Sequence, residues 1–154
     1  MKRSSMENEV CAVARSLDVI GDWWTLLIVR DALAGLRRFG EFQRSLGAAK
    51  NILTTRLRAL VAQGILETAP ASDGSAYQEY RLTAKGRALV PVLVALGQWS
   101  NEHVFLPEQE RILPVDRAQR LPIQPLQVVA ADGRRLAPEE VHFDAPQRPP
   151  AGLS

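Results

Sequence analysis

The sequence predicts a mainly α-helical domain that carries one small β-hairpin and is followed by a short, β-rich tail. Three observations support this fold class. Apolar residues recur at helical spacing in four stretches before Ile65, and glycines separate these stretches. The stretches 65–68 and 77–82 flank the turn-forming sequence 72–75, which predicts a hairpin. Eight of the ten prolines lie between Pro107 and Pro150, so this part is not a long helix.

The first two expected helices follow from apolar spacing and from the residues at their ends. The first has one apolar stripe, which we expect to be buried, made of Val10, Val13, Ala14 and Leu17. Gly21 ends this helix. Asp22 then caps a second helix over 23–34, because its carboxylate can accept the free amide hydrogens of the first turn. Gly35 stops the second helix.

The third and fourth expected helices form a helix-turn-helix. A short helix over 40–46 turns Phe39 and Phe42 to the core, and Gly47 breaks the chain after it. The fourth helix runs to Gly64 and has an apolar stripe made of Leu53, Leu57, Leu60 and Val61. Two helices joined by a tight glycine-containing turn, the second longer and basic, are typical of this motif. The hairpin directly behind it makes the motif a winged helix-turn-helix.

A last helix follows the hairpin. Thr83 is expected to cap it, and Pro91 is tolerated near the first turn of its continuation. Its apolar stripe is made of Leu89, Leu93, Leu96 and Trp99. Such a stripe either closes the core or packs against a second copy of the chain. We favour the second use, which assigns Leu93, Leu96 and Trp99 to a homodimer interface.

The expected organisation has three parts. Residues 1–106 form the winged domain with its dimerisation helices, 107–145 form a proline-rich tail, and 146–154 are expected to be disordered. In the tail, Ile123–Ala130 and Arg135–Phe143 are predicted to pair as a hairpin, because the Asp132-Gly133 dipeptide between them suits a tight turn.

Composition argues against several classes of protein. No apolar stretch is long enough to span a bilayer, and the N-terminus lacks the apolar core of a secretory signal. The single cysteine, Cys11, excludes an intramolecular disulfide framework, and we expect a cytoplasmic protein. Phosphate-binding loops, dinucleotide fingerprints and paired-carboxylate constellations are missing from the sequence. We therefore expect neither an enzyme nor a cofactor.

Positive charge is concentrated between Arg30 and Arg58. This segment holds seven basic and two acidic residues, whereas the whole chain has a net charge of only +2. A basic segment in a nearly neutral chain suggests a surface that faces a polyanion. A solvated helical face is the alternative.

The fourth helix carries the side chains of a recognition helix. Asn51, Thr55 and Arg58 lie at i, i+4 and i+7 and share the face away from the apolar stripe. Lys50 and Thr54 flank this face. Side chains of these types read base edges in a major groove or bind phosphate.

Other basic residues are expected to hold phosphate without reading sequence. These are Arg37, Arg38 and Arg44. Arg56 either contributes to the same surface or has a structural role, in which it pairs with Glu41.

From Cys11 to Val104 the sequence resembles the HxlR-type regulators, a family of bacterial winged-helix transcription factors. The motifs that carry the resemblance are, in order, WWTLLIVRDAL, GLRRFGEFQRSLG, NILTTRLRALVAQGILE and EYRLTAKGRALVPVL. The resemblance implies a homodimer whose first and last helices interlock and whose two recognition helices face one palindromic operator. It also implies a regulator, more often a repressor, that responds to a small molecule or a reactive electrophile.

The wing and the tail depart from the family pattern. Family wings commonly carry arginines after the first strand. At that place this chain has Thr68-Ala69-Pro70, and its turn holds Asp73. We therefore expect weak wing contacts to phosphate. Some relatives have paired cysteines in the tail, at places where this chain has Val129 and Asp132. Because zinc usually needs four good ligands, we expect no metal site there.

The resemblance also makes Cys11 a candidate oxidant sensor. Sensing requires a thiolate, which the nearby Arg15 would favour; an inert buried thiol is the alternative. Trp23 and Trp24 are candidates for stacking on an effector, although such residues more often belong to a core.

One function from another class remains open. A winged helix can serve as a protein-interaction module whose basic face binds an acidic partner. Binding to random duplex that weakens steeply with salt would distinguish a DNA-binding protein from such a module.

Overall fold

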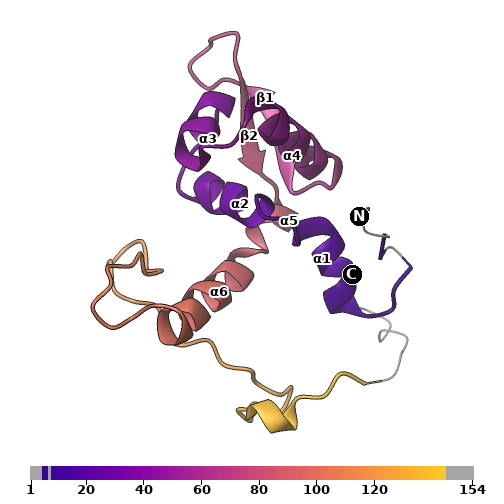
Figure 1. The fold of residues 1–154 in the computed structure, drawn as a ribbon, viewed down its shortest axis with the longest axis vertical. Helices are drawn as coiled ribbons and strands as arrows, with labels where there is room; N and C mark the ends of the chain where they lie inside the picture. Colours follow the sequence, from indigo (N-terminus) through magenta and orange to yellow (C-terminus); the bar gives the residue numbers. More distant parts are fainter. Residues whose placement is uncertain (1–4, 7, 145–154) are drawn as a thin grey trace. The chain divides into compact units, whose positions relative to one another are not determined.

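The computed structural model describes residues 5–6 and 8–144, which divide after Leu93 into two compact units. The first unit has the predicted fold, a helical domain with one β-hairpin. In chain order its elements are α1 (Ala12–Ile20), α2 (Thr25–Leu33), α3 (Phe39–Leu46), α4 (Lys50–Ala62), β1 (Leu66–Pro70), β2 (Gln78–Leu82) and α5 (Ala84–Arg87) (Figure 1). A last helix, α6 (Val90–His103), continues from this unit into the second. The expectation of disorder over 146–154 lies outside the described residues.

Asp22 accepts amide hydrogens at the start of α2, as the sequence predicts, although α2 covers Thr25–Leu33 and is shorter than the predicted range of 23–34. The backbone amides of Trp24 and Thr25 donate to Oδ1 of Asp22 over 2.8 and 2.9 Å. Gly35 and Gly47 follow α2 and α3 with φ values of +107° and +63°, where a side chain would strain the backbone. These ends fix the short connections that bring α2, α3 and α4 together.

The core of the first unit lies between α2, α3, α4 and the hairpin. Leu53, Leu57 and Leu60 of α4 are buried at the predicted stripe positions. Phe42 of α3 is fully buried, and Phe39 packs against the same cluster. The other buried members of the cluster are Ile28, Val29, Ala32, Ala48, Ile65, Leu66 and Leu82. The predicted core faces of α3 and α4 are thus confirmed.

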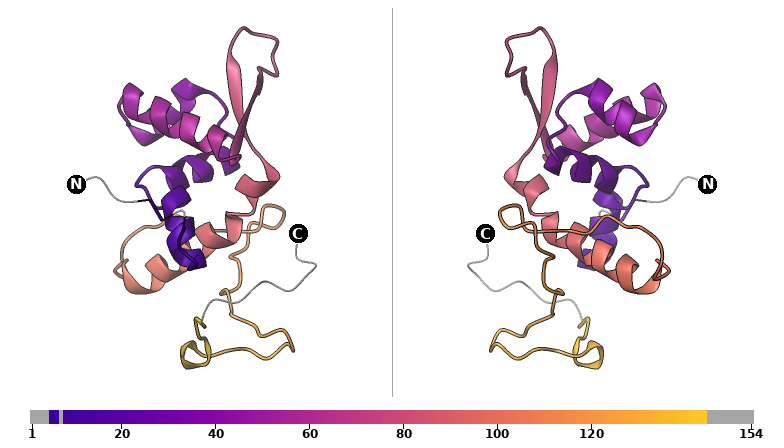
Figure 2. Two further views of the ribbon diagram at one scale, coloured as in Figure 1. Left: turned by 90° about the vertical axis from the view of Figure 1, so that its right-hand side faces the viewer. Right: turned by 90° about the vertical axis from the view of Figure 1, so that its left-hand side faces the viewer.

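β1 and β2 form an antiparallel hairpin, with Leu66 opposite Leu82 at its base. The backbone amide of Tyr80 in β2 donates to the carbonyl of Arg37 over 2.7 Å. The Tyr80 ring also packs edge-on against Phe42, with 6.4 Å between the ring centroids. These contacts hold the α2–α3 connection beside β2, and the hairpin extends past α3 and α4 as a wing (Figure 2).

The apolar stripe predicted for α1 is not buried within the chain. Val10, Val13 and Leu17 are 75%, 51% and 45% exposed, and α1 contains no buried residue. The expected burial of this stripe is therefore wrong for a single chain. Only the last turn of α1, with Val19 and Ile20, packs against the core, because α2, α3, α4 and the hairpin already enclose most of it.

The apolar stripe of the last helix divides between two surroundings. Leu89 and Leu93 pack against the core of the first unit. Leu96 and Trp99, further along α6, are 49% and 60% exposed. One stripe thus closes the core at its start and leaves large apolar side chains uncovered further along.

The second unit consists of the later part of α6 and the tail. The Gln98 side chain donates to the carbonyl of Gln124 over 2.9 Å and accepts the amide of Leu126 over 2.8 Å. This pair of hydrogen bonds ties the tail to α6. It explains why the compact units divide after Leu93, whereas the sequence places the domain limit after residue 106.

The tail forms less β-structure than the sequence predicts. In its described part, pairing is limited to isolated bridges of Val115 with Pro122 and of Val129 with Arg135. The second bridge closes the predicted turn, in which Gly133 has a φ of +89°.

The two long strands predicted on either side of this turn, Ile123–Ala130 and Arg135–Phe143, do not form. Pro125 has no amide hydrogen to donate to a partner strand, and Pro138 opens a short 3₁₀ turn. Proline therefore limits the hairpin to the residues next to its turn.

Candidate nucleic-acid interface

The residues that the sequence assigns to a recognition helix lie together on α4. One shallow surface depression is lined by Lys50, Asn51, Thr54, Thr55 and Arg58, which we call the α4 face. The buried leucines occupy the other side of the helix, so core packing fixes the direction in which the α4 face points. The structure thus brings these predicted residues into one patch of polar side chains.

The two threonines of the α4 face are partly committed to their own helix. The hydroxyls of Thr54 and Thr55 donate to the carbonyls of Lys50 and Asn51 over 2.8 and 2.9 Å. Their oxygens keep lone pairs that can accept a hydrogen bond, and their methyl groups can make apolar contacts. In a major groove these groups suit the amino groups of cytosine or adenine and the methyl group of thymine.

The cations of this region are open to a ligand. None of the ion pairs in the described part of the chain involves Lys50, Arg58 or the exposed Arg44 of α3. Lys50 is the first residue of α4, and the preceding Ala49 gives no side-chain hydrogen bond to the helix start. Free amides and the helix dipole make such a start favourable for an anion. The charge here therefore suits DNA phosphate.

Arg37 has structural partners instead. Its Nη1 donates to the carbonyls of Ala32 and Leu36 over 2.9 and 3.1 Å, at the C-terminal end of α2. Its backbone amide donates to a carboxylate oxygen of Glu41 over 3.2 Å. A guanidinium at this place adds a donor to the carbonyl of Ala32, which also accepts the amide of Gly35, and to the carbonyl of Leu36 just after the helix.

Arg56 also has a structural partner, but not the one considered from the sequence. Its Nε lies 3.6 Å from Oδ1 of Asp22, so the pairing with Glu41 is wrong. Burial raises the pKa of Asp22, but hydrogen bonds from Thr25 and Trp24, with the charge of Arg56, outweigh burial and leave that pKa below its ordinary value. Asp22 thus links the start of α2 to α4.

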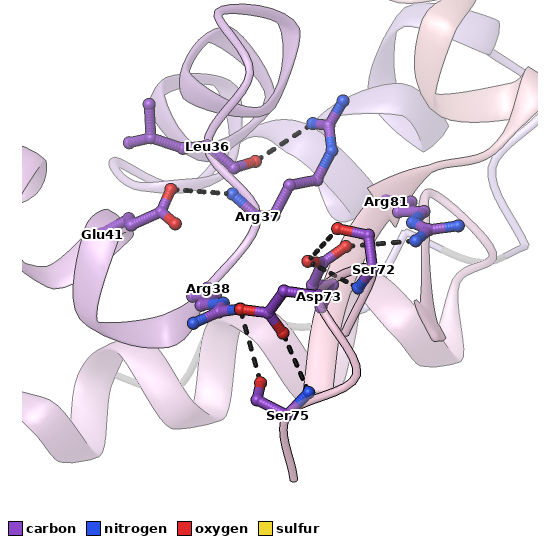
Figure 3. A network of polar contacts seen from close by, with 9 residues as sticks. Leu36, Arg37, Arg38, Glu41, Ser72, Asp73, Ser75 and Arg81 are labelled. Atoms are coloured by element: carbon purple, nitrogen blue, oxygen red, sulfur yellow. Dashed lines mark hydrogen bonds and ion pairs between the residues drawn. The ribbon is translucent and has the colours of Figure 1, made fainter. Parts of the chain in front are cut away.

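Arg38 is held by the wing. Its Nη2 forms a short hydrogen bond and ion pair with Oδ2 of Asp73, and a longer bond of 3.5 Å with the Ser75 hydroxyl (Figure 3). The guanidinium carbon also lies 5.2 Å from the centroid of the Tyr77 ring, a cation–π arrangement. We call Arg38, Asp73, Ser75 and Tyr77 the wing clamp.

The acid of the wing clamp is ionised at neutral pH. Oδ1 of Asp73 accepts the backbone amide of Ser75 over 3.0 Å, which closes the turn at the wing tip. The backbone amide and hydroxyl of Ser75, followed by the guanidinium of Arg38, hold the pKa of the Asp73 carboxyl well below its usual range. The positive charge of Arg38 is therefore balanced by a full negative charge beside it.

The other cation of the wing is paired as well. Arg81 Nη2 donates to Oε2 of Glu79 over 3.1 Å. Glu79 is buried, and its Oε1 accepts the backbone amide and hydroxyl of Ser72 over 3.1 and 3.0 Å. These bonds, with that to the Ser72 amide first, lower the pKa of Glu79. The arginines on the wing side thus each have an acidic partner.

The candidate sensing residues lie in different surroundings. Trp24 packs against the core, but Trp23 is 80% exposed, so the core interpretation is wrong for Trp23. Cys11 is the residue before α1 and is exposed, so it is not an inert buried thiol. An apolar pocket in the first unit lies elsewhere, between α1 and α5, and is lined by Ser16, Val19, Ile20, Ile65, Lys85 and Leu89.

The acids that pair with these arginines were not identified from the sequence. It identifies Asp73 as part of a turn, but its partner Arg38 lies 35 residues earlier, and no local pattern connects them. For Glu79 and Arg81 a signal exists, because residues two apart in a strand point to the same side.

In the described ranges, no group of three or more His, Cys, Asp or Glu side chains is arranged to hold a metal ion. The described helices also include none that is long and apolar enough to cross a membrane.

The helical domain, its wing and the α4 face define a winged helix-turn-helix, a fold used to bind DNA. The model of the HxlR-like helix-turn-helix family matches residues 19–109. The chain belongs to this family, as the resemblance of its motifs implied.

Two curated relatives carry names that fit the fold. The uncharacterised HTH-type transcriptional regulator Mb3122 of Mycobacterium bovis is 44% identical over 97 residues, which cover 63% of this chain and only 61% of that relative. The uncharacterised HTH-type transcriptional regulator YvaP of Bacillus subtilis is 30% identical over 100 residues, covering 64% of this chain and 93% of YvaP.

Solved structures extend the similarity. PA1607, described as a candidate transcription factor, is 53% identical and covers 92% of this chain and 99% of its own, with a TM-score of 0.85. The redox regulator HypR in its reduced form is 32% identical and covers 60% of this chain and 92% of its own, with a TM-score of 0.55. The family and these neighbours identify the fold of a transcriptional regulator.

Proposed function

We propose that the protein is a sequence-specific DNA-binding repressor that works as a homodimer on a palindromic operator, in the cytoplasm. It is a regulator and not an enzyme. The α4 helix is the recognition helix, and the α4 face enters the major groove. The observation that carries this proposal is the α4 face itself, where polar side chains and unpaired cations lie opposite the buried leucines.

The chemistry of each side chain suggests a role. Arg58 can donate two hydrogen bonds to guanine, and Asn51 can pair with adenine in the same way. Lys50, at the start of α4, and Arg44, on α3, contact phosphate and set the position of the domain. We do not assign Arg37 or Arg38 to DNA, because both guanidiniums have protein partners.

A second copy of the chain would cover the apolar side chains that α1 and α6 leave exposed, among them Leu17, Leu96 and Trp99. Two recognition helices related by a two-fold axis, about 34 Å apart, would read a palindrome. Trp99→Ala should therefore shift the protein from dimer to monomer in sedimentation at low micromolar concentration, and operator binding should fall with it. A monomeric wild type under these conditions contradicts the homodimer.

Selection from a pool of random duplexes tests sequence-specific binding. The wild type is expected to enrich a palindromic sequence, and Arg58→Ala is expected to enrich it much less. Arg15→Ala, which removes an exposed cation from α1, should behave as the wild type. A wild type that enriches nothing and binds duplex independently of salt would contradict the proposal and favour the interaction module with an acidic partner.

We also propose that the regulator responds to an effector, with Cys11 as an oxidant-sensing thiol. Cys11 is exposed and lies beside Val10 and Val13, which we assign to the surface between the two copies. HypR, a structural neighbour, is named a redox regulator in reduced and oxidised forms. If the two Cys11 Cα atoms come within about 7 Å, an oxidant such as diamide can take one hydrogen from each thiol and leave a disulfide.

The test compares operator binding by the wild type and by Cys11→Ser, before and after diamide. A loss of binding confined to the wild type supports the sensor. An equal response of both proteins shows that Cys11 is not the sensor, and an effector that stacks on Trp23 and Trp24 is then the proposal to test by tryptophan fluorescence.

A further inference from the structure

The hairpin carries more acids than cations, whereas wings that bind DNA usually offer cations. From 66 to 82 the hairpin has one cation, Arg81, and three acids, Glu67, Asp73 and Glu79. A second cation, Arg38 at the start of α3, lies against the hairpin and is bound to Asp73. The wing therefore has no arginine or lysine that is free of an acid partner.

Arg38 is fixed from several directions at once. Its Nη2 donates to Asp73 and to the Ser75 hydroxyl (Figure 3). The Tyr77 ring also covers one face of the guanidinium. The side chain is 31% exposed, so it is not removed from solvent, only paired. A phosphate that approached Arg38 would meet the Asp73 carboxylate at almost the same distance, and the repulsion would offset the attraction.

We propose that Asp73 withholds Arg38 from DNA phosphate, so that the wing adds no net attraction and binding depends on the sequence-reading α4 face. This inference rests on the DNA-binding function proposed above. Affinity for random duplex follows the number of phosphates that cations neutralise, and each adds about 0.9 to the salt slope. An arginine paired with a carboxylate neutralises none. Asp73 is therefore a specificity-determining residue, because it lowers non-specific affinity and leaves the α4 contacts unchanged.

Asp73→Asn tests the proposal with little change of shape. The Asn side-chain oxygen can still accept the Ser75 amide and close the turn, but the negative charge is gone. The affinity for random duplex is measured by fluorescence anisotropy as salt is raised from about 50 to 200 mM. The slope of log affinity against log salt should steepen by about 0.9, so the advantage of the variant should be about three times larger at the lower salt.

Two controls separate the release of Arg38 from a general effect of charge. Glu67→Gln removes one negative charge from an exposed position of β1, so it matches Asp73→Asn in net charge. In an Arg38→Ala background, Asp73→Asn releases no guanidinium, and its gain should fall to that of Glu67→Gln. The comparison of Asp73→Asn with Glu67→Gln stands by itself if Arg38→Ala does not fold.

If the wild type binds duplex, two results would overturn this inference and leave the proposed function intact. In the first, Asp73→Asn and Glu67→Gln change the slope equally. In the second, Asp73→Asn binds more weakly than the wild type, which would show that Asp73 positions Arg38 for phosphate. A wild type without salt-dependent duplex binding is a distinguishable failure, because it removes the proposed function and this inference together.

Discussion

The α4 face and the wing belong to the same compact unit and both carry cations, but only the cations of the wing are paired with acids. Lys50 and Arg58 have no acidic partner in the described part of the chain, and their neighbours on the α4 face are Asn and Thr. In the wing, Arg38 is bound to Asp73 and Arg81 to Glu79. A count of basic residues therefore overstates the number of unpaired cations, and we propose that pairing decides which surface binds DNA.

The largest expected effect comes from truncating the buried side chain of Phe42, which should disturb the packing of both regions. This fully buried ring packs α3 into the core and touches Tyr80 of the wing. Phe42→Ala should lower the free energy of unfolding by about 3–5 kcal/mol, because it leaves a cavity that the core cannot fill. Urea unfolding measures this loss, and Ser45→Ala, at an exposed position of the same helix, should change it by less than about 0.5 kcal/mol. Equal effects of the two variants would show that α3 is not anchored through this ring.

A smaller effect is expected from one side chain of the α4 face. Arg58→Ala should weaken binding to the selected operator by about 1–3 kcal/mol, because it removes a charged donor that suits a base edge. Arg15→Ala makes the same change of net charge on α1 and should cost less than about 0.5 kcal/mol. Anisotropy titrations at one salt concentration measure both. If the two variants lose the same affinity, Arg58 acts through general charge and not through contact.

The α4 face could be predicted from sequence because it depends on short-range periodicity. The spacing of Leu53, Leu57 and Leu60 fixes the buried side of the helix, and Asn51 and Arg58 must then point away from it. The cap at Asp22 has the same local character, since its acceptors and donors are two or three residues apart. Family motifs added the order of the elements.

The wing clamp could not be predicted in this way. The ion pair of Arg38 with Asp73 needs the α2–α3 connection beside the hairpin, which depends on packing between distant parts of the chain. The exposure of Trp23 beside a half-buried Trp24 follows from the direction in which the chain enters α2, and sequence alone does not give it. In the tail, favourable turn chemistry at Gly133 suggested long strands, but Pro125 and Pro138, several residues from the turn, prevented them.

A still smaller effect is expected from removing the acidic partner of Arg56, the one cation of α4 with a structural role. Asp22 caps α2 and pairs with Arg56, so Asp22→Ala should lower the free energy of unfolding by about 1 kcal/mol at neutral pH. The folded state depresses the pKa of Asp22, so its contribution is complete above the ordinary carboxyl pKa of about 4 and is lost as pH falls through the lower, folded value.

Urea unfolding at neutral pH and in acid measures this dependence. The difference between the wild type and Asp22→Ala should shrink in acid, whereas Asp22→Asn, which keeps an acceptor for the helix amides, should lose only the part due to charge. A difference that grows as the pH falls would contradict the depressed pKa.

The most direct test compares the two regions by their effect on the salt slope of duplex binding. Lys50→Ala removes an unpaired cation that we assign to phosphate, and the double variant Arg38→Ala/Asp73→Asn removes the paired cation together with its acid. We predict that Lys50→Ala flattens the slope by about 0.9 and that the double variant keeps the slope of the wild type. If the double variant flattens the slope as much as Lys50→Ala, the wing contacts DNA through Arg38, and pairing does not decide which surface binds.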